Sequence, residues 1–145
     1  MNPILAIDFG RARIGVAVSD ELQLLAHPLE TIAANERSIA RVAEIVRGRN
    51  VDHVVVGIPR QLSGKIGAAA TEALRFAEKL RAILPCPVVA WDERLTTIAA
   101  HRALREAGKR TRATRHYIDQ VAAQMILQGY LDRRQHAAHA EEMSR

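Results

Sequence analysis

Acidic residues end two of the apolar stretches of this sequence. Asp8 follows one such stretch and precedes a turn that carries Arg11 and Arg13, and Glu93 lies just after the apolar run at residues 88–91. A carboxylate beside basic groups and glycines suits metal-assisted phosphate chemistry. For Asp8 the alternative is an ordinary hairpin turn that its carboxylate caps.

A third carboxylate, Asp119, shares a helical stripe with small and apolar residues. Ala122, Ala123 and Ile126 follow it at i+3, i+4 and i+7, so the acid lies on the face that packs against the rest of the fold. A carboxylate on that face needs a cation or hydrogen-bond donors. A metal ion, a salt bridge to Arg94, or the favourable charge of a first helical turn would each meet that need.

Taken together, Asp8, Glu93 and Asp119 favour one cation site built from three carboxylates. Ligands that are all oxygen suit Mg²⁺ or Mn²⁺, whereas zinc prefers His or Cys. The His residues are scattered along the chain and predict no site of their own. We expect Asp92 to orient or cap its turn rather than to bind metal.

The composition describes a single globular domain. The chain has 145 residues, of which 48% are hydrophobic, and this is enough for one domain with one core. It contains no apolar run long enough to span a membrane. The single cysteine, Cys86, permits neither an internal disulfide nor a zinc cluster. We therefore expect a cytoplasmic protein without a membrane partner.

The charge balance favours a polyanionic partner. Lys and Arg number 21 against 16 acids, for a net charge of +5, and aromatic residues make up only 3%. With few rings on which bases could stack, contacts to phosphates should dominate over base readout. For each basic residue a solvated surface charge is the alternative to a phosphate contact. The candidates are Arg11, Arg13, Arg60, Lys65, Arg94, Lys109, Arg110, Arg112 and Arg115.

Hydrophobic periodicity predicts three strands followed by alternating helices and strands. The predicted strands are 4–8, 14–18, 24–32, 52–58 and 88–91, and Pro28 makes the third an edge strand. The predicted helices run from an N-cap at Asn35 to about 48–50, along an inner face at 70–84, from Thr96 or Thr97 to about Ala107, and over 116–133. The polar tail, residues 134–145, is expected to fray.

This element order predicts an α/β fold with a mixed five-stranded sheet. The first three strands should form an antiparallel meander, and the two later strands, joined through helices, should be parallel. Helices would then cover both faces. In such sheets the chemistry lies beyond the carboxyl ends of the parallel strands, where Asp8 and Glu93 fall.

Five motifs of the chain resemble those of the YqgF family, and they span residues 4–132 in the family's order. The family comprises small bacterial proteins with an RNase H-like fold, described as Holliday junction resolvases and as pre-16S rRNA nucleases. The motifs are Asp8-Phe9-Gly10, Arg13-Ile14-Gly15-Val16-Ala17 with Ser19-Asp20, Gly57-Ile58-Pro59, Asp92-Glu93-Arg94-Leu95-Thr96-Thr97, and the closing Asp119...Ala122-Ala123...Ile126-Leu127-Gln128-Gly129-Tyr130-Leu131-Asp132.

The resemblance implies an RNase H-like nuclease domain over 1–133 and Mg²⁺-dependent cleavage of phosphodiesters by Asp8, Glu93 and Asp119. It further implies a role in ribosome biogenesis, at the 5′ end of 16S rRNA, and contacts with ribosomal particles. Asp8 would bridge two ions, with one further acid completing each coordination shell. The chain departs from the family pattern at Ala12, where a basic residue is usual, and at Ser63, where Asp precedes the glycine.

Other functions stay open from the sequence. The hairpin around Asp8 also resembles the first phosphate loop of the actin, sugar-kinase and Hsp70 ATPases, but those proteins need two such lobes. A non-catalytic nucleic-acid-binding module is a further alternative. A resolvase of branched DNA should act as a symmetric homodimer, because two strands must be cut, whereas a nuclease for one rRNA end can act as a monomer.

Overall fold

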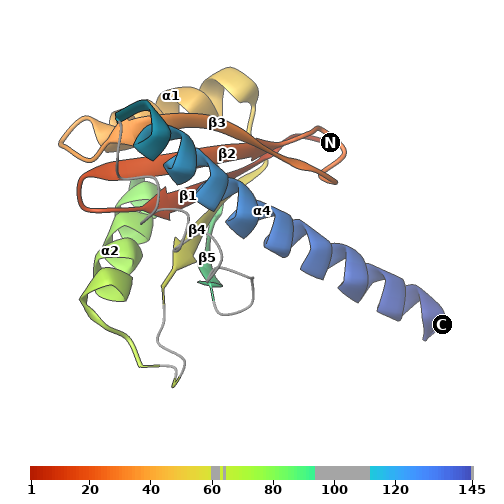
Figure 1. Ribbon diagram of the computed structural model, residues 1–145. Helices are drawn as coiled ribbons and strands as arrows, with labels where there is room; N and C mark the ends of the chain where they lie inside the picture. Colours follow the sequence, from red (N-terminus) through yellow and green to blue (C-terminus); the bar gives the residue numbers. More distant parts are fainter. Residues whose placement is uncertain (60–62, 64, 94–111, 145) are drawn as a thin grey trace.

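The computed structural model describes residues 1–59, 63, 65–93 and 112–144 of the chain. Within them, five strands form one mixed sheet in the order β3-β2-β1-β4-β5 (Figure 1). The first three pair antiparallel, and β1, β4 and β5 are mutually parallel, which confirms the predicted sheet. The strands are β1 (Ile4–Phe9), β2 (Arg13–Ser19), β3 (Ala26–Ala33), β4 (His53–Ile58) and β5 (Val88–Asp92).

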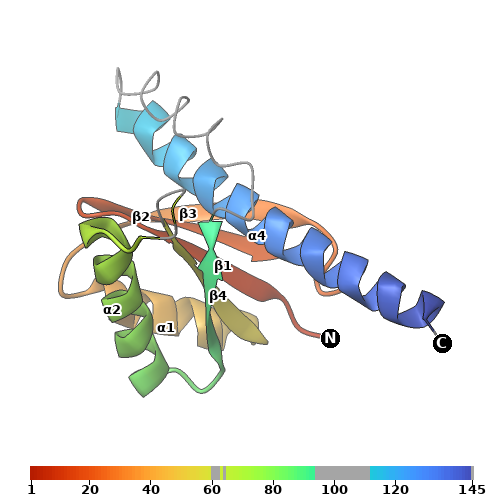
Figure 2. The same cartoon turned by 90° about the horizontal axis from the view of Figure 1, so that it is seen from below.

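Helices cover both faces of this sheet. The helices α1 (Ser38–Arg49) and α2 (Ala68–Ile83) pack on one face, and the long helix α4 (Arg112–Met143) crosses the other (Figure 2). The third helix expected from Thr96 or Thr97 to Ala107 lies outside the described residues. No helix in the described part of the chain is long and apolar enough to cross a membrane.

Side-chain alternation along the strands divides the interior into two apolar cores. On β1, Leu5 and Ile7 join the larger core under α1 and α2, whereas Ile4 and Ala6 join the smaller core under α4. Phe9 ends the strand on the side of α2, where its ring stacks on Phe76 with centroids 4.8 Å apart. This stack anchors the end of β1. Asp8 therefore has the same orientation as Ile4 and Ala6, toward α4.

Helix α1 shows one correct and one wrong prediction of a helix boundary. It ends as predicted, with Asn50 in the left-handed region at a φ of 53° and its backbone N–H bonded back into the last turn. Asn35 is not the N-cap. Its Oδ1 accepts from the backbone N–H of Arg37, the residue before the helix, so it closes a separate turn ahead of Ser38.

The predicted end of the last helix near Arg133 is also wrong, because α4 continues to Met143. Residues 134–143 contain three alanines, two glutamates and a glutamine, with neither Gly nor Pro, so intrinsic helix propensity carries the helix past the body of the fold. The extension is exposed along its length and projects away from the sheet (Figure 1).

Pro28 lies on the edge strand β3, as predicted. It pairs with Ala17, whereas the neighbouring Val16 pairs with Glu30, so β3 carries one extra residue at this point. Such a bulge, with a proline in it, disfavours pairing with a further strand.

Candidate active site

The three predicted acids all lie on or near the face of the sheet that α4 covers. Asp8 faces this side from β1, Glu93 follows β5 with the orientation of Trp91, which packs in the smaller core, and Asp119 comes from α4 itself. Their exposed fractions are 8%, 6% and 5%. Burial of three carboxylates is costly, so a fold keeps it only with compensation or for a function. We call these three residues the acidic site.

Gly15 brings α4 onto the sheet directly beside Asp8. It pairs with Asp8 across β1 and β2, and a Cβ placed on it would lie 1.9 Å from the backbone oxygen of Asp119. Only glycine permits so close an approach of helix backbone to strand. The contact fixes the helical turn that carries Asp119 over the strand next to Asp8.

Gly57 likewise allows the side chain of Glu93 to lie close to strand β4. It lies on β4, which runs parallel to β1 with Ile7 opposite Val56, so Gly57 follows one residue beyond the last recorded pair. A Cβ on Gly57 would lie 2.8 Å from Oε1 of Glu93 and 2.6 Å from Cδ1 of Ile126. The carboxylate of Glu93 thus lies directly over a strand residue that has no side chain.

Asp119 forms an ion pair with Arg13, the first residue of β2. Nε of Arg13 donates to Oδ2 of Asp119 at 2.6 Å, with side chains 30% and 8% exposed. The sequence predicts that this acid meets a cation or a hydrogen-bond donor, with a salt bridge to Arg94 as one alternative. The structure gives that role to Arg13, and Arg94 lies outside the described residues.

Glutamines on α4 set the position of the helix along the edge strand. Gln124 donates to the backbone oxygen of Ala26, and Gln128 accepts from the backbone N–H of the same residue at 2.9 Å. One turn before Asp119, the backbone oxygen of His116 accepts from the hydroxyl of Thr31 at 2.6 Å, and Gln120 donates to that hydroxyl. These bonds keep Asp119 from sliding along the sheet.

The donor set of the acidic site fits a hard divalent cation, because all of its ligating atoms are carboxylate oxygens. The geometry is less complete. Across the described ranges, no group of three or more His, Cys, Asp or Glu side chains is placed to hold one metal ion. In this arrangement Oδ2 of Asp119 is bonded to Nε of Arg13.

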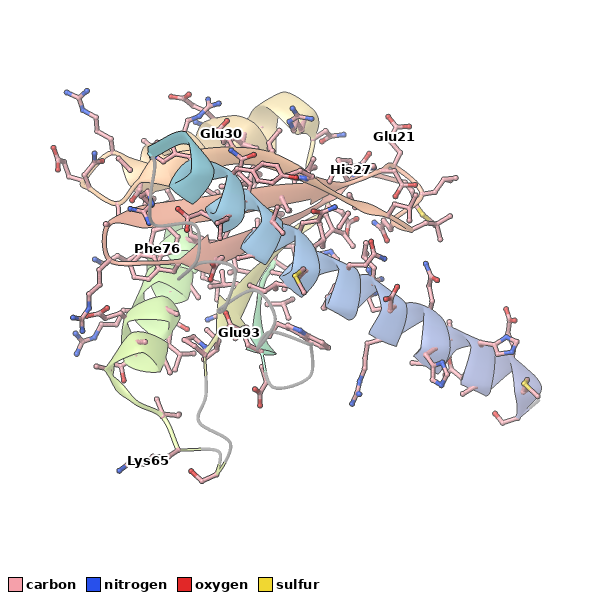
Figure 3. The ribbon with its side chains drawn as sticks, in the orientation of Figure 1. Glu21, His27, Glu30, Lys65, Phe76 and Glu93 are labelled. Atoms are coloured by element: carbon pink, nitrogen blue, oxygen red, sulfur yellow. The ribbon has the colours of Figure 1, made fainter. Side chains whose placement is uncertain are left out.

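The predicted phosphate contacts divide into described and undescribed residues. Arg11 is exposed and pairs with Glu72 of α2 at 3.1 Å. Lys65 is exposed on the connection between β4 and α2 and points into solvent, away from Glu93 (Figure 3). Arg60, Arg94, Lys109 and Arg110 lie outside the described residues, as do the side chains of Arg112 and Arg115.

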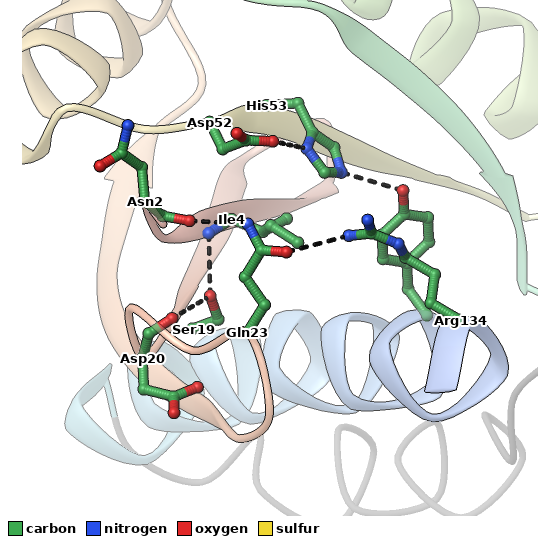
Figure 4. A network of polar contacts seen from close by, with 9 residues as sticks. Asn2, Ile4, Ser19, Asp20, Gln23, Asp52, His53 and Arg134 are labelled. Atoms are coloured by element: carbon green, nitrogen blue, oxygen red, sulfur yellow. Dashed lines mark hydrogen bonds and ion pairs between the residues drawn. The ribbon is translucent and has the colours of Figure 1, made fainter. Parts of the chain in front are cut away.

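A second cluster of polar side chains lies at the opposite end of β1 and β4. Nδ1 of His53 contacts Oδ2 of Asp52 at 2.6 Å, and its Nε2 contacts the hydroxyl of Tyr130 at 2.9 Å. Arg134 lies over the ring of Tyr130 and donates to Oε1 of Gln23 (Figure 4). We call these five residues the His53 network. Burial raises the pKa of Tyr130 above its usual value, so its hydroxyl stays protonated at neutral pH.

Sequence reasoning proposed the acids as site residues but missed the residues that position them. Gly15 and Gly57 each interrupt an apolar strand, which is a usual sign of a close backbone approach. The spacing of Gln120, Gln124 and Gln128 at four residues also marks one polar edge of the last helix. The pairing of Arg13 with Asp119 has no such local signal.

Comparison with known families places the molecule. Residues 2–133 match the family described as "RuvX: Holliday junction resolvase". The chain belongs to the RuvX family. This confirms the resemblance that the motifs indicate, and it makes the chain a member of a nuclease family.

Curated relatives in the RuvX family are similar over most of their length. A protein of Nocardia farcinica is 50% identical over 139 residues, which cover 90% of this chain and 77% of that protein. A protein of Chloroflexus aggregans is 48% identical over 133 residues, which cover 90% and 94%. Both carry the name "Putative pre-16S rRNA nuclease".

Solved structures establish the RNase H-like fold of this RuvX chain. T. thermophilus RuvC in complex with a Holliday junction substrate matches with a TM-score of 0.55 and 19% identity, covering 93% of this chain and 96% of that one. The fowlpox virus Holliday junction resolvase matches with a TM-score of 0.50 and 14% identity, covering 90% and 98%. At these identities the likeness concerns the fold alone.

Proposed function

We propose that this RuvX-family chain is a metal-dependent endonuclease that processes the 5′ end of pre-16S rRNA in the cytoplasm. One observation carries the proposal. Asp8, Glu93 and Asp119 come from three separate parts of the chain, and all three are buried: Asp8 and Glu93 on the side of the sheet that α4 covers, and Asp119 on α4 itself. The name shared by the relatives supports rRNA as the substrate. The family match, which ends at residue 133, supports assigning the catalytic domain to 1–133 and a polar extension to 134–145.

In this proposal Asp8, Glu93 and Asp119 hold Mg²⁺ or Mn²⁺. When bound, the cation lowers the pKa of an attacking water and stabilises the leaving oxygen of the phosphodiester. The chain supplies the rest. Asp8 is rigid because β1 is paired on both sides, and the apolar core around Ile126 and Gly57 limits the access of water to the acids.

Nucleic acid would be held through its phosphates. The net charge of +5 and the scarcity of aromatic residues favour contacts that depend on charge and shape. Arg11 and Lys65 are exposed and available among the described residues. Arg60, Arg94, Lys109, Arg110, Arg112 and Arg115 complete the proposed contact set. Affinity should therefore fall steeply with salt.

Resolution of Holliday junctions is the second candidate, and the description of the matched family favours it. It predicts a homodimer on a four-way DNA junction, whereas cleavage at one rRNA end needs only a monomer. The mass of the complex in solution with each substrate separates the two. Ribosomal particles that carry unprocessed rRNA are the natural form of the first substrate.

The deciding experiment compares Asp8→Asn with Asp132→Asn. Both remove one carboxylate without changing its shape, but Asp132 is exposed on α4 beyond the acidic site and bonds to Gln128. Each protein is incubated with precursor 16S rRNA and with a four-way DNA junction, with Mg²⁺ and with EDTA. We expect Asp8→Asn to lose more than about a hundredfold in cleavage, since even residues behind metal ligands contribute roughly ten- to a hundredfold.

A control variant and two contrary outcomes complete the cleavage experiment. Asp132→Asn should cleave at the wild-type rate, and EDTA should stop all cleavage. Equal cleavage by Asp8→Asn and wild type would contradict the proposal and point to a contaminating nuclease. Retained RNA binding without any cleavage in wild type would favour the non-catalytic module.

A further inference from the structure

The sheet holds Arg13 in a fixed place beside Asp119 of the acidic site. Arg13 opens β2, pairs with Ala33 of β3, and has the same orientation as Gly15 and Ala17, toward α4. The preceding residue, Ala12, accepts a backbone hydrogen bond from Ala34 at 3.0 Å. The strand end that carries Arg13 is therefore held by the sheet.

Asp119, the partner of Arg13, is also held in a fixed position. Asp119 lies on the turn of α4 that rests on Gly15, and the bonds from Thr31 and Gln120 hold the adjacent turn. Nε of Arg13 meets Oδ2 of Asp119 at 2.6 Å, and the carboxylate is 8% exposed. Two groups that are each anchored through the backbone meet here, unlike the flexible ends of a surface pair.

A guanidinium and a divalent cation satisfy the same requirement of a buried carboxylate. Each supplies positive charge to a group that burial destabilises. Both cannot be close to one carboxylate without repelling each other. The ion pair with Arg13 already occupies Oδ2, one of the two oxygens that Asp119 could offer to a cation.

We propose that Arg13 is a positioning residue that competes with the divalent cation for Asp119. In the metal-free protein it neutralises Asp119 and keeps the acidic site stable, and metal binding requires this ion pair to be exchanged. The inference rests on the proposed function in one respect, namely that Asp119 is a metal ligand. It changes the role of Arg13 from the phosphate contact that the sequence predicts.

Metal affinity without nucleic acid tests this directly. Free Mn²⁺ is titrated by electron paramagnetic resonance into wild type, Arg13→Gln and Arg41→Gln. Arg41 is a matched control, because it also pairs with carboxylates, those of Glu30 and Glu44, but on the surface of α1. A guanidinium beside the carboxylate repels an incoming cation, and its removal takes that repulsion away. We expect Arg13→Gln to bind Mn²⁺ at least tenfold more tightly, and Arg41→Gln to match wild type.

Two further variants show that the effect passes through Asp119. In the Asp119→Asn background, Arg13→Gln should give no gain in affinity, because the shared carboxylate is gone. Arg13→Lys keeps the charge and should stay close to wild type. Thermal unfolding verifies that each variant is folded, and Arg13→Met, which keeps the apolar stem, replaces Arg13→Gln if that variant is unfolded.

Unchanged, weaker or undetectable Mn²⁺ binding by folded Arg13→Gln or Arg13→Met would overturn the inference. The proposed function fails separately. If Arg13→Gln binds Mn²⁺ more tightly but the wild-type protein cleaves no substrate, the inference is sustained and the proposed nuclease function is rejected. Cleavage by wild type with equal Mn²⁺ affinity in both proteins would reject the inference alone.

Discussion

The two polar clusters under α4 are built in opposite ways. In the His53 network, the ionisable groups meet neutral groups or one another: His53 contacts Asp52 and the hydroxyl of Tyr130, and Arg134 donates to the amide oxygen of Gln23. In the acidic site, three carboxylates are buried on one face with Arg13 as a cation among them. The first is a closed network that fastens the helix to the sheet. The second concentrates like charges, which a stable fold avoids unless a function requires them.

The packing between α4 and the sheet also differs between the His53 network and the acidic site. Around the His53 network large rings fill the gap, with Trp91 edge-on to Tyr130 at 5.2 Å between centroids. At the acidic site glycines replace side chains, so that helix backbone and carboxylates approach the strands. The comparison teaches that substitutions at the His53 network should change stability alone, whereas substitutions at the acidic site should separate stability from function.

The largest change in the free energy of unfolding is expected from Gly15→Ala. The added Cβ would lie 1.9 Å from the backbone oxygen of Asp119, and both groups are backbone-anchored, so α4 must shift. We expect a loss of about 3 kcal/mol or more in the free energy of unfolding, measured by urea denaturation. Cleavage should fall as well, because Asp119 moves with the helix.

Gly48→Ala is the matched control for this substitution. A Cβ on Gly48, in α1, has no atom within 4 Å, so the same chemical change should stabilise the protein by about 0.5–1 kcal/mol through helix propensity. A Gly15→Ala protein as stable as wild type would show that α4 does not rest on β2 as described.

Periodicity and chain order predicted the sheet, its parallel and antiparallel parts and the place of Asp8, because side-chain alternation and right-handed crossovers leave few topologies. They did not predict the partner of Asp119. The contact of that acid with Arg13 depends on how far α4 is shifted along β3, and this shift is set by contacts between residues about a hundred positions apart, such as Gln128 with Ala26.

The misplaced helix ends have local causes. At Asn35 the same side chain suits an N-cap and a turn, and the structure uses it for the turn, three residues before Ser38. At the other end of the chain, polarity in residues 134–143 suggested a frayed tail, but helix propensity depends on alanine and glutamate rather than on apolar burial. Polar composition and helical structure are compatible when nothing must be buried.

Tyr130→Phe sharpens the comparison at the His53 network. The change removes the hydroxyl that contacts Nε2 of His53 and keeps the ring against Trp91. We expect a loss of about 1 kcal/mol in the free energy of unfolding with unchanged cleavage. A loss of cleavage comparable to that of Asp8→Asn would show that the two clusters are coupled along α4.

Asp8→Asn should have the reverse signature. Replacing a buried carboxylate by an amide of the same shape removes one of the like charges of the acidic site. We expect the free energy of unfolding of the metal-free protein to stay the same or rise by about 0.5–1 kcal/mol while cleavage is lost, as for other functional groups that cost stability. A strongly destabilised Asp8→Asn protein would assign Asp8 a structural role instead.

The smallest effect concerns Asp20, which closes the turn beside the His53 network. Its Oδ1 accepts from the backbone N–H groups of Leu25 and Leu24, and these bonds hold the pKa of the carboxyl below its usual value of 3.8. A carboxyl group whose pKa is lower in the folded protein stabilises the fold at pH values above its pKa in the unfolded chain. This contribution is lost as the pH falls through its pKa in the folded protein.

In Asp20→Asn the amide oxygen can still accept both bonds, so only the charge is removed. Wild type should therefore be slightly more stable than Asp20→Asn at pH 7, and the difference should vanish as the pH falls below 3.8, measured by urea denaturation across that range. A difference that persists unchanged in acid would mean that the charge of Asp20 contributes nothing and that shape alone closes the turn.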